Sequence, residues 1–328
     1  MKNFLIPNIS QKIERILKRE CLKPKISPKK FIEKTKGGKH RYCSLCKNPS
    51  EKKIIFYARI QKNKDAAKKV KKETALAISF QKKNFQEKIP FLRFLPEYYK
   101  GKFEKDFEWF EREFIKENPL GDNEKLEKRP SKDKISKIVD FLSCLWKTRI
   151  SCFRNIPLGT FPLSNYKNIS LSIEKFRKEK IITEKEFTKG KEFIKKYINI
   201  FKKEHRYLSH GDFNLGNIIF TKKGLKVIDW ESMEINNFAY DIAYLFCHLW
   251  QTKQWQRKYL IEKYLERLPK NKKEIFKILF RGNLLFLATG GIWAKPKEIK
   301  TAQLKKRKEF FKKITKASLR DFEEILLI

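Results

Sequence analysis

No uninterrupted apolar run in this 328-residue sequence approaches the ~18 residues of a membrane-spanning helix, so no transmembrane segment is expected. The first residues also lack the apolar core of a signal peptide, which makes a cytoplasmic protein the expectation. No internal repeat is visible. Because 41% of the residues are hydrophobic and 28 are Phe, the chain can build a sizeable core, which excludes a disordered polybasic tail.

Cysteines at metal-binding spacing are also scarce. "CSLC" at 43–46 is the only C-x-x-C pair, and no second pair or H-x-H partner stands at zinc-finger spacing. Reduced and mostly buried thiols are therefore expected instead of a zinc site. The six cysteines are Cys21, Cys43, Cys46, Cys144, Cys152 and Cys247.

The chain has few acidic residues and few arginines. Against 38 Asp+Glu stand 78 Lys+Arg, a formal charge of +40, and only 16 of the 78 are Arg. The lysines permit two interpretations, a lysine-biased composition on a solvated surface or a functional polyanion-binding face. A nucleic-acid binder would gather basic residues in a stripe with interleaved aromatics, and it would use the Arg fork. Because the lysines run along the whole chain, nucleic-acid binding is not expected.

The first third of the chain mixes strand and helix patterns. A helix is expected at 10–21, and residues 1–30 form an N-terminal helical extension. From 31 to 116 the order is strand, Gly37-Gly38 turn, strand, strand, helix, strand, strand, which predicts a small sheet carrying one helix. The segments after the glycines are 41–45, 54–60, a helix at 65–81 that Asp65 could cap, 91–99 and 109–115.

The remainder is chiefly helical. A polar, proline-containing linker is expected at 117–135, followed by helices such as 134–147 and 191–204, with helices throughout from 254. The exception is 217–230, two short apolar runs around a glycine-containing turn, which predicts a β-hairpin. The fold class is thus α+β, with a small β-rich lobe at 31–116 and a larger helical lobe at 117–328 that contains the hairpin.

Two short polar stretches carry the candidate chemistry, "HGDFNLGN" at 210–217 and "IDWE" at 228–231. The hairpin between them can return Asp229 to the edge where Asn217 lies. A carboxylate and an amide oxygen are hard ligands that suit Mg²⁺, and Asp212 could accept the proton of a hydroxyl. Base, metal ligands and a place for a triphosphate are the parts of phosphoryl transfer. The alternative is a polar loop and hairpin without chemistry.

"HGDFNLGN" followed by "VIDWE" resembles the signature of the aminoglycoside phosphotransferase and choline kinase superfamily, and the resemblance extends from Phe31 to Phe311. It implies a protein-kinase-like fold of two lobes with ATP and Mg²⁺ as cofactors. It also implies Asp212 as the catalytic base and Asn217 and Asp229 as the metal ligands.

The choline and ethanolamine kinase branch is the most similar. "GGKHRYCSL" resembles its glycine-rich loop, which implies that Gly37 and Gly38 bind the nucleotide. "FYARIQ" resembles its third strand, where this branch carries Arg and others carry Lys, so Arg59 is implied as a phosphate contact. Glu73 on the following helix is its implied ion-pair partner, or else part of a solvated helix face.

Further nucleotide contacts are implied at the lobe connection and the catalytic loop. "REFIKENPL" resembles the connection, so backbone groups near Glu113, Phe114 and Ile115 would meet adenine. Asn214 stands where the family has a nucleotide-contacting amide. Asp241, before the apolar helix "IAYLFCHLW", either caps that helix or braces the catalytic loop.

The acceptor site departs from the choline kinase pattern. Ser232 stands in place of a Tyr and His248 in place of an acid, and the loop reads His-Gly-Asp where choline kinases read His-Asn-Asp. Of two family tryptophans Trp293 remains, while Gly290 replaces the other. An ammonium site needs aromatic faces and negative charge, and this site has lost some of both. The implied acceptor residues are Glu231, His248, Trp250 and Trp293.

These features predict an ATP- and Mg²⁺-dependent phosphotransferase that moves the γ-phosphate to the hydroxyl of a small molecule, with a choline- or ethanolamine-like acceptor as the leading candidate. Alternatives are another small alcohol (a sugar, an amino alcohol or an aminoglycoside) or a catalytically weak kinase-fold binding protein. The weak-kinase alternative predicts loss of Asp212, Asn217 or Asp229, and all three are present. The choice of ATP or GTP and the oligomeric state remain open.

Overall fold

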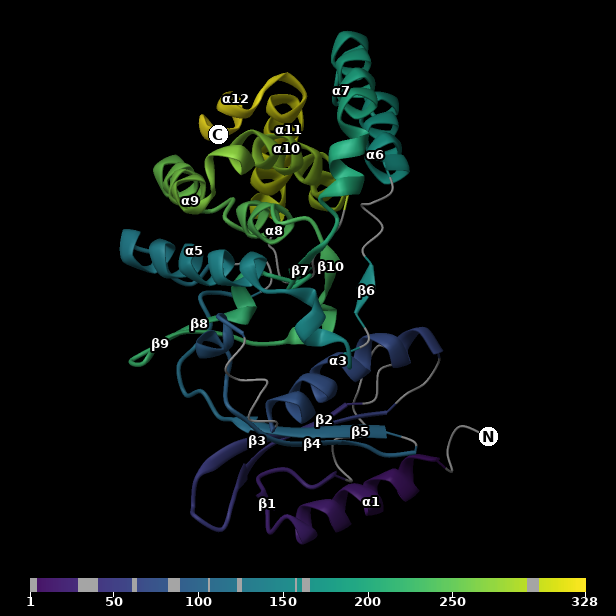
Figure 1. Ribbon diagram of the computed structural model, residues 1–328, viewed down its shortest axis with the longest axis vertical. Coiled ribbons are helices and arrows are strands. Elements are labelled where there is room, and N and C mark those ends of the chain that lie inside the picture. Colours follow the sequence, from purple (N-terminus) through teal and green to yellow (C-terminus); the bar gives the residue numbers. More distant parts are fainter. Residues whose placement is uncertain are drawn as a thin grey trace. The chain divides into compact units, whose positions relative to one another are not determined.

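The computed structural model describes residues 5–28, 41–60, 64–81, 89–105, 107–122, 126–156, 158–160, 166–293 and 301–328. The chain forms two compact units (Figure 1). The first contains Met1–Lys116, Ser151–Leu158 and Asp229–Ser232, and the second contains Glu117–Ile150, Gly159–Ile228 and Met233–Ile328. Gly37, Gly38 and the strand expected before them lie outside the described residues.

An antiparallel sheet with a helix on each face makes up the first unit (Figure 1). The described strands follow the order β1-β2-β3-β5-β4, and Arg59 of β3 pairs with Arg41 of β2 and Glu108 of β5. The elements are α1 (Leu5–Arg19), β1 (Lys23–Pro24), β2 (Arg41–Lys47), β3 (Lys53–Ile60), α3 (Lys64–Phe80), β4 (Tyr98–Phe103) and β5 (Phe107–Glu113).

Helix α1 covers one face of this sheet because its apolar residues recur at helical spacing. Ile9, Ile13 and Leu17 are buried with Phe56 and Trp109 in one cluster. Since strand side chains alternate between faces, the neighbours of Phe56 along β3 point the other way, toward α3. This alternation is what places Arg59 under α3.

The same alternation bears on the C-x-x-C pair. Cys43 and Cys46 both lie in β2, and their three-residue separation puts them on opposite faces of the sheet. Cys46 is buried in the α1 cluster, where burial raises the pKa of its thiol to about 11. Among the described residues no group of three or more His, Cys, Asp and Glu is arranged to hold a metal. The six cysteines are free thiols, but only Cys46 and Cys247 are buried, so the expectation of mostly buried thiols is wrong.

The second unit is largely helical. Ser131 caps the first of its helices, and a capping box of Thr183 and Glu186 starts α7. Its described helices are α5 (Lys132–Lys147), α6 (Tyr166–Lys178), α7 (Glu184–Lys203), α8 (Tyr240–His248), α9 (Gln254–Arg267), α10 (Lys270–Trp293), α11 (Thr301–Arg320) and α12 (Phe322–Leu326).

Short strands hold the polar loop of this unit. The hairpin expected at 217–230 is present as β8 (Ile218–Thr221) and β9 (Gly224–Val227). A second small sheet has the order β6-β10-β7, with β6 at Gly159–Thr160, β7 at Tyr207–Ser209 and β10 at Glu234–Asn236. Strand β7 ends where "HGDFNLGN" begins, so the sheet fixes the start of this loop.

Helix α10 is long and apolar enough to cross a membrane by length and composition. In the fold it packs against α6, α8 and α11, and just over half of its most apolar stretch is buried. Phe276, Phe280 and Leu284 have no exposed surface. These contacts are those of the core helix of a folded unit.

Two expectations from the sequence need correction. Residues 91–99 are not one strand, because a 3-10 turn covers Leu92–Phe94 and β4 starts only at Tyr98, beyond Pro96, which has no N–H for a sheet. Residues 117–135 are not a simple linker either. The Leu120 N–H donates to the Ile218 carbonyl, and α5 already begins at Lys132.

Candidate active site

Arg59 and Glu73 form a buried ion pair in the first unit. The Arg59 Nη2 lies 3.0 Å from Glu73 Oε2, and Tyr98 donates its hydroxyl to the other oxygen of Glu73 at 3.0 Å. Glu73 is 2% exposed, so it is not part of a solvated helix face. The ion pair expected from the sequence is therefore confirmed, and it joins β3 to α3.

Two carboxylates after the hairpin lie at the same guanidinium. Arg59 Nη1 is 3.3 Å from Glu231 Oε2, and Nη2 is 4.0 Å from Asp229 Oδ1. Burial alone would lower the pKa of Arg59, but the negative charges around it, of which Glu73 is the strongest, raise it above its ordinary value. The guanidinium therefore stays charged although it is almost completely shielded from solvent.

Glu231, which the sequence assigns to the acceptor pocket, contacts Arg59 within the first unit. Its role toward an acceptor stays a prediction. Between Asp229 and Glu231, the buried Trp230 stacks on Phe91 at 5.1 Å. Phe91 stacks in turn on Phe153 at 6.1 Å, so this aromatic stack anchors the 229–232 segment in the first unit.

Asp229 has a left-handed backbone with φ of 63°. A non-glycine residue in this region is uncommon, and such strain is typical of functional sites. Its side chain is 37% exposed, so the carboxylate keeps contact with solvent although it lies 4.0 Å from Arg59. Asp229 is thus held in a special conformation with its carboxylate accessible.

In the loop at 210–217 of the second unit, the Asp212 carboxylate is surrounded by hydrogen-bond donors. Its Oδ1 accepts the Tyr244 hydroxyl at 2.9 Å and the Asn214 Nδ2 at 3.0 Å. Asn217 Nδ2 donates to the Asp212 backbone carbonyl at 2.8 Å. The carboxylate therefore has a fixed orientation in a loop that is itself hydrogen-bonded.

Asn214 is held by contacts within the same loop. Its Nδ2 donates to Asp212, its Oδ1 accepts the Gly216 N–H at 2.8 Å, and the residue is 3% exposed. Asn214 thus shapes the turn that carries Asp212, and the nucleotide contact implied for it stays a prediction.

Asp241 braces the same loop from α8. Its carboxylate accepts hydrogen bonds from Ser209 Oγ at 2.9 Å, His210 N at 2.9 Å and Gly211 N at 3.1 Å. The N-cap of α8 is Ala239, which makes no side-chain capping hydrogen bond. Burial raises the pKa of Asp241, and the three hydrogen bonds oppose that rise. Of the two roles considered for Asp241, the structure selects the brace.

His210 links the loop that carries Asp212 to Ile228, the residue after strand β9. Its Nε2 lies 3.0 Å from the Ile228 carbonyl, and its Nδ1 accepts the Asp212 N–H at 3.3 Å. Because a carbonyl only accepts, the ring proton is on Nε2. Gly211 between them has φ of 79°, which glycine adopts without strain. The buried ring thus ties the loop that carries Asp212 to the residue before Asp229.

Asn217 of the second unit and Asp229 of the first each carry an oxygen of the kind that a hard cation accepts. The Ile228 N–H donates to the Asn217 carbonyl at 3.0 Å, so the hairpin returns the residue before Asp229 to Asn217, as the sequence predicts. Since Nδ2 of Asn217 is used by Asp212, its Oδ1 is the atom left for a ligand. An amide oxygen and a carboxylate are a donor set that Mg²⁺ accepts together with water and phosphate oxygens.

At residues 113–115, the segment expected to connect the lobes, part of the backbone is engaged in hydrogen bonds within the first unit. The Glu113 N–H donates to the Glu97 carbonyl at 2.7 Å, and the Glu113 carbonyl accepts Arg112 Nη1 at 3.3 Å. Phe114 and Ile115, which follow β5, are partly exposed and lie outside any strand. Contact of this backbone with adenine, implied by the sequence, stays a prediction.

Tyr244 is the residue that sequence reasoning missed. It lies on α8 one turn before His248, and the two rings are 4.9 Å apart. His248 is thereby linked through Tyr244 to Asp212, which agrees with an acceptor-site position. The i, i+4 spacing to His248 was visible in the sequence, but the hydrogen bond to Asp212 was not. Trp250 lies in the turn after α8 and is half-buried.

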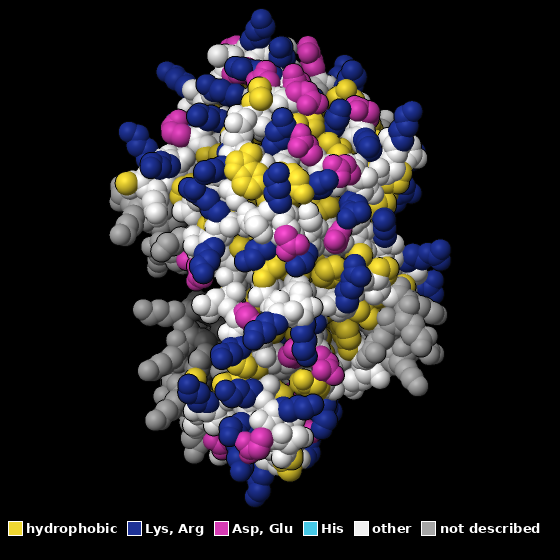
Figure 2. Space-filling view, turned by 90° about the vertical axis from the view of Figure 1, so that its left-hand side faces the viewer, with side chains coloured by type: hydrophobic (Ala, Val, Ile, Leu, Met, Phe, Trp, Pro, Cys, Tyr) yellow, Lys and Arg dark blue, Asp and Glu magenta, His cyan; other side chains and the backbone are white. Residues whose placement is uncertain are grey.

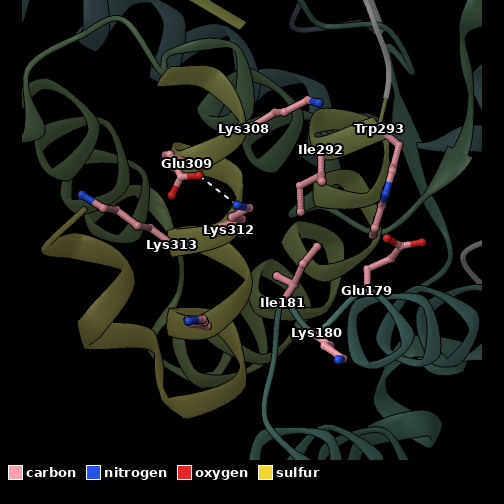
Figure 3. A pocket seen from close by; sticks show the side chains of 10 residues that line it. Glu179, Lys180, Ile181, Ile292, Trp293, Lys308, Glu309, Lys312 and Lys313 are labelled. Atoms are coloured by element: carbon pink, nitrogen blue, oxygen red, sulfur yellow. Dashed lines mark hydrogen bonds and ion pairs between the residues drawn. The ribbon is translucent and has the colours of Figure 1, made fainter. Parts of the chain in front are cut away.

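Trp293 lies in a different environment, at the end of α10. Its ring stacks on Phe176 of α6 at 5.5 Å, and Lys175 Nζ is 4.0 Å from the ring centre. It lines a cavity of about 480 Å³ (Figure 3), whose walls also include Ile181, Ile292 and five lysines. These contacts are with α6 and α11, so the structure gives no support to Trp293 as a wall beside Asp212.

Comparison with known proteins agrees with this geometry. Residues 187–269 match the model of the phosphotransferase enzyme family, a segment that holds the catalytic loop, the hairpin, Asp229 and α8. Among solved structures, the GDP complex of aminoglycoside 2'-phosphotransferase-IIIa is 13% identical with a TM-score of 0.54, over 92% of this chain and 97% of that one. A macrolide 2'-phosphotransferase type I is 14% identical with a TM-score of 0.51, over 94% and 98%.

A structure of an aminoglycoside phosphotransferase with GDP and kanamycin is 12% identical with a TM-score of 0.53, over 92% of this chain and 98% of that one. At these identities the likeness establishes the fold, which is protein-kinase-like and α+β as the sequence predicts. The segment 187–269 around Asp212, which matches the phosphotransferase enzyme family, is what identifies the chain as a phosphotransferase enzyme.

Proposed function

We propose that this protein is an ATP- and Mg²⁺-dependent small-molecule kinase that transfers the γ-phosphate to an alcohol. The observation that carries the proposal is the Asp212 carboxylate, held by Tyr244 and Asn214 in a loop that Asp241 braces. A fixed carboxylate within the matched family segment is what a proton-accepting base requires.

The residues would divide the work as follows. Asp212 orients the acceptor hydroxyl and takes its proton while the hydroxyl oxygen bonds to the γ-phosphorus and the bond to the leaving ADP breaks. Asn217 and Asp229 would hold Mg²⁺, which when bound neutralises charge on the phosphate oxygens. Arg59, kept charged by Glu73, would add a fixed positive charge for the triphosphate.

A choline- or ethanolamine-like acceptor is the leading candidate. An ammonium group seeks aromatic faces and negative charge, and Tyr244 and Asp212 supply one of each in the second unit. The charge of Glu231 is partly offset by Arg59, and His248 stands where choline kinases carry an acid. Sugars and amino alcohols, which need hydrogen bonds more than an aromatic cage, are therefore the next acceptors to consider.

The dispersed lysines do not favour a nucleic-acid binder. On the face shown in Figure 2, Lys and Arg side chains alternate with acidic and apolar ones and do not gather in one stripe. The same excess of positive charge disfavours polycationic aminoglycosides as substrates.

The test is a panel of alcohols with purified protein, following ADP formation with and without Mg²⁺, for the wild type and Asp212→Asn. We expect Mg²⁺-dependent turnover of at least one small hydroxyl compound. Asp212→Asn should bind ATP normally and lose ~10²–10⁴-fold in turnover. A wild type that turns over no acceptor would favour the catalytically weak binding protein, and full activity of Asp212→Asn would remove Asp212 as the base.

A further inference from the structure

Helix α8 offers a ligand two side chains only. From Tyr240 to His248 every residue is buried except Tyr244 and His248, which are partly exposed. They are four residues apart and therefore lie on the same side of the helix, with ring centres 4.9 Å apart. Tyr244 and His248 thus form the exposed side of α8, and Tyr244 contacts Asp212, the candidate base.

The two oxygens of Asp212 have different surroundings. Oδ1 accepts two hydrogen bonds of normal length, from the Tyr244 hydroxyl at 2.9 Å and from Asn214 Nδ2 at 3.0 Å. Oδ2 has one contact among the described residues, Asn217 Nδ2 at 3.4 Å, which is long for a hydrogen bond. Oδ1 is therefore saturated by the protein, and Oδ2 remains for another donor.

A carboxylate rotates easily about its terminal torsion, because that torsion is broad and nearly two-fold. Asn214 lies in the same loop two residues away, and its amide alone fixes the carboxylate only locally. Tyr244 holds Oδ1 from a separate helix, whose packing is fixed by its buried residues. The hydroxyl thereby sets the direction in which Oδ2 points.

We propose that Tyr244 is a positioning residue, whose hydroxyl occupies Oδ1 of Asp212 and so assigns proton acceptance to Oδ2. This inference rests on the proposed kinase function. In the reaction the proton of the acceptor hydroxyl passes to Oδ2, the hydroxyl oxygen bonds to the γ-phosphorus, and ADP leaves with the electrons of the broken bond. Without Tyr244 the carboxylate samples orientations in which neither oxygen meets the hydroxyl.

The test is Tyr244→Phe, which keeps the ring beside His248 and removes only the hydroxyl. Because Tyr244 is partly exposed, this change leaves no buried unsatisfied group and the fold should be retained. We expect kcat to fall roughly 10- to 100-fold with the KM for ATP unchanged. The control is Tyr259→Phe, whose hydroxyl contacts Ser136 at 3.3 Å between α5 and α9 and which should match the wild type.

A second measurement separates positioning from a general structural role. Because Tyr244 acts through Asp212, adding Tyr244→Phe to Asp212→Asn should cause no further loss of kcat. Losses that multiply in the double variant, an unchanged kcat in the single variant, or a joint fall of the melting temperature and ATP binding would each overturn the proposal. After any of these three results, the kinase function still holds if the wild type phosphorylates an acceptor. An inactive wild type would instead overturn both the kinase function and the role of Tyr244.

Discussion

The guanidinium of Arg59 and the carboxylate of Glu73 form an ion pair at 3.0 Å in which each side chain is 3% exposed. A second nitrogen of the same guanidinium lies 3.3 Å from Glu231. The two carboxylates are approached by two different nitrogens of the Arg fork, a geometry that the single nitrogen of Lys does not offer. Arg at this position of β3 fits both contacts.

Arg59→Ala should weaken ATP binding more than acceptor binding, since the charge is proposed to face the triphosphate. It also leaves Glu73 buried without its partner, so the free energy of unfolding should fall by roughly 3–5 kcal/mol. Arg59→Lys keeps the charge and should lose less of both. Titration of each ligand and chemical denaturation measure these effects. Equal loss of both ligands in Arg59→Lys would mean that Arg59 acts on folding alone.

The metal assignment predicts different effects for its two ligands. Asp229→Asn is the informative change, because Asn tolerates the left-handed backbone that Ala would strain. It should abolish Mg²⁺-dependent ATP binding, while Asn217→Ala should raise the Mg²⁺ concentration required. Magnesium titrations of nucleotide binding provide the measurement, with Asp133→Asn on an exposed turn of α5 as the control. Unchanged titrations in both variants would defeat the assignment.

The sequence predicted the parts of this site that depend on local pattern. The hairpin, its return of the chain to Asn217, and helix α3 with Glu73 follow from periodicity and turn residues over short distances. The resemblance to choline kinases supplied the Arg59–Glu73 pairing across fourteen residues. In each case a local element or a known motif fixes the geometry.

The rest depends on tertiary contacts that no local pattern encodes. Whether Asp241 caps α8 or braces a loop depends on its contact with Gly211, thirty residues upstream. That contact results from the packing of α8, which the sequence alone does not show. Glu231 pairs with Arg59 because the Trp230 stack on Phe91 holds it there. In the sequence, Tyr244 resembles an aromatic residue of any core helix. Only the structure shows that its hydroxyl donates to Asp212.

Glu111 predicts a pH-dependent stability. It shares the α1 face of β5 with Trp109, and burial raises the pKa of its carboxyl to about 7, partly opposed by Lys100. Because the folded pKa lies above the unfolded value of 4.5, the fold favours the protonated form. Stability should therefore fall as pH rises from about 4.5 to about 7, by roughly 3 kcal/mol, and then level off.

The measurement is urea denaturation from pH 4.5 to 8 for the wild type, Glu111→Gln and the exposed control Glu117→Gln. Glu111→Gln should lose most of this slope, and the control should keep it. A slope that survives in Glu111→Gln would assign the pH dependence to other groups.

Two adjacent glycines in α10 should respond oppositely to alanine. A Cβ at Gly291 would lie 2.3 Å from the ring of Phe311, where α10 and α11 pack closely, whereas a Cβ at Gly290 meets no described atom within 4 Å. Gly291→Ala should therefore destabilise the protein by roughly 1–3 kcal/mol. Gly290→Ala should stabilise it by up to ~1 kcal/mol through helix propensity. Thermal unfolding of both variants decides, and equal shifts would contradict the close packing of α10 on α11.

The choice of acceptor is decided at His248. Its ring lies tilted against that of Tyr244, which donates to Asp212, so a carboxylate placed there would lie on the exposed side of α8 near Asp212. His248→Glu should therefore lower the KM for choline and ethanolamine, because negative charge offsets the loss of water around an ammonium group. Neutral sugars should gain nothing from it.

The assay compares choline, ethanolamine, a simple sugar and an aminoglycoside at matched concentration in the wild type and His248→Glu. Asn271→Glu, the same change of charge at the exposed start of α10, controls for a general effect of charge. An aminoglycoside should be the poorest substrate of the wild type, because a chain of net charge +40 repels a polycation. Strong wild-type activity on the aminoglycoside would overturn this electrostatic reasoning. No gain for choline in His248→Glu would place the ammonium site away from α8, and the acceptor would then contact Asp212 through its hydroxyl alone.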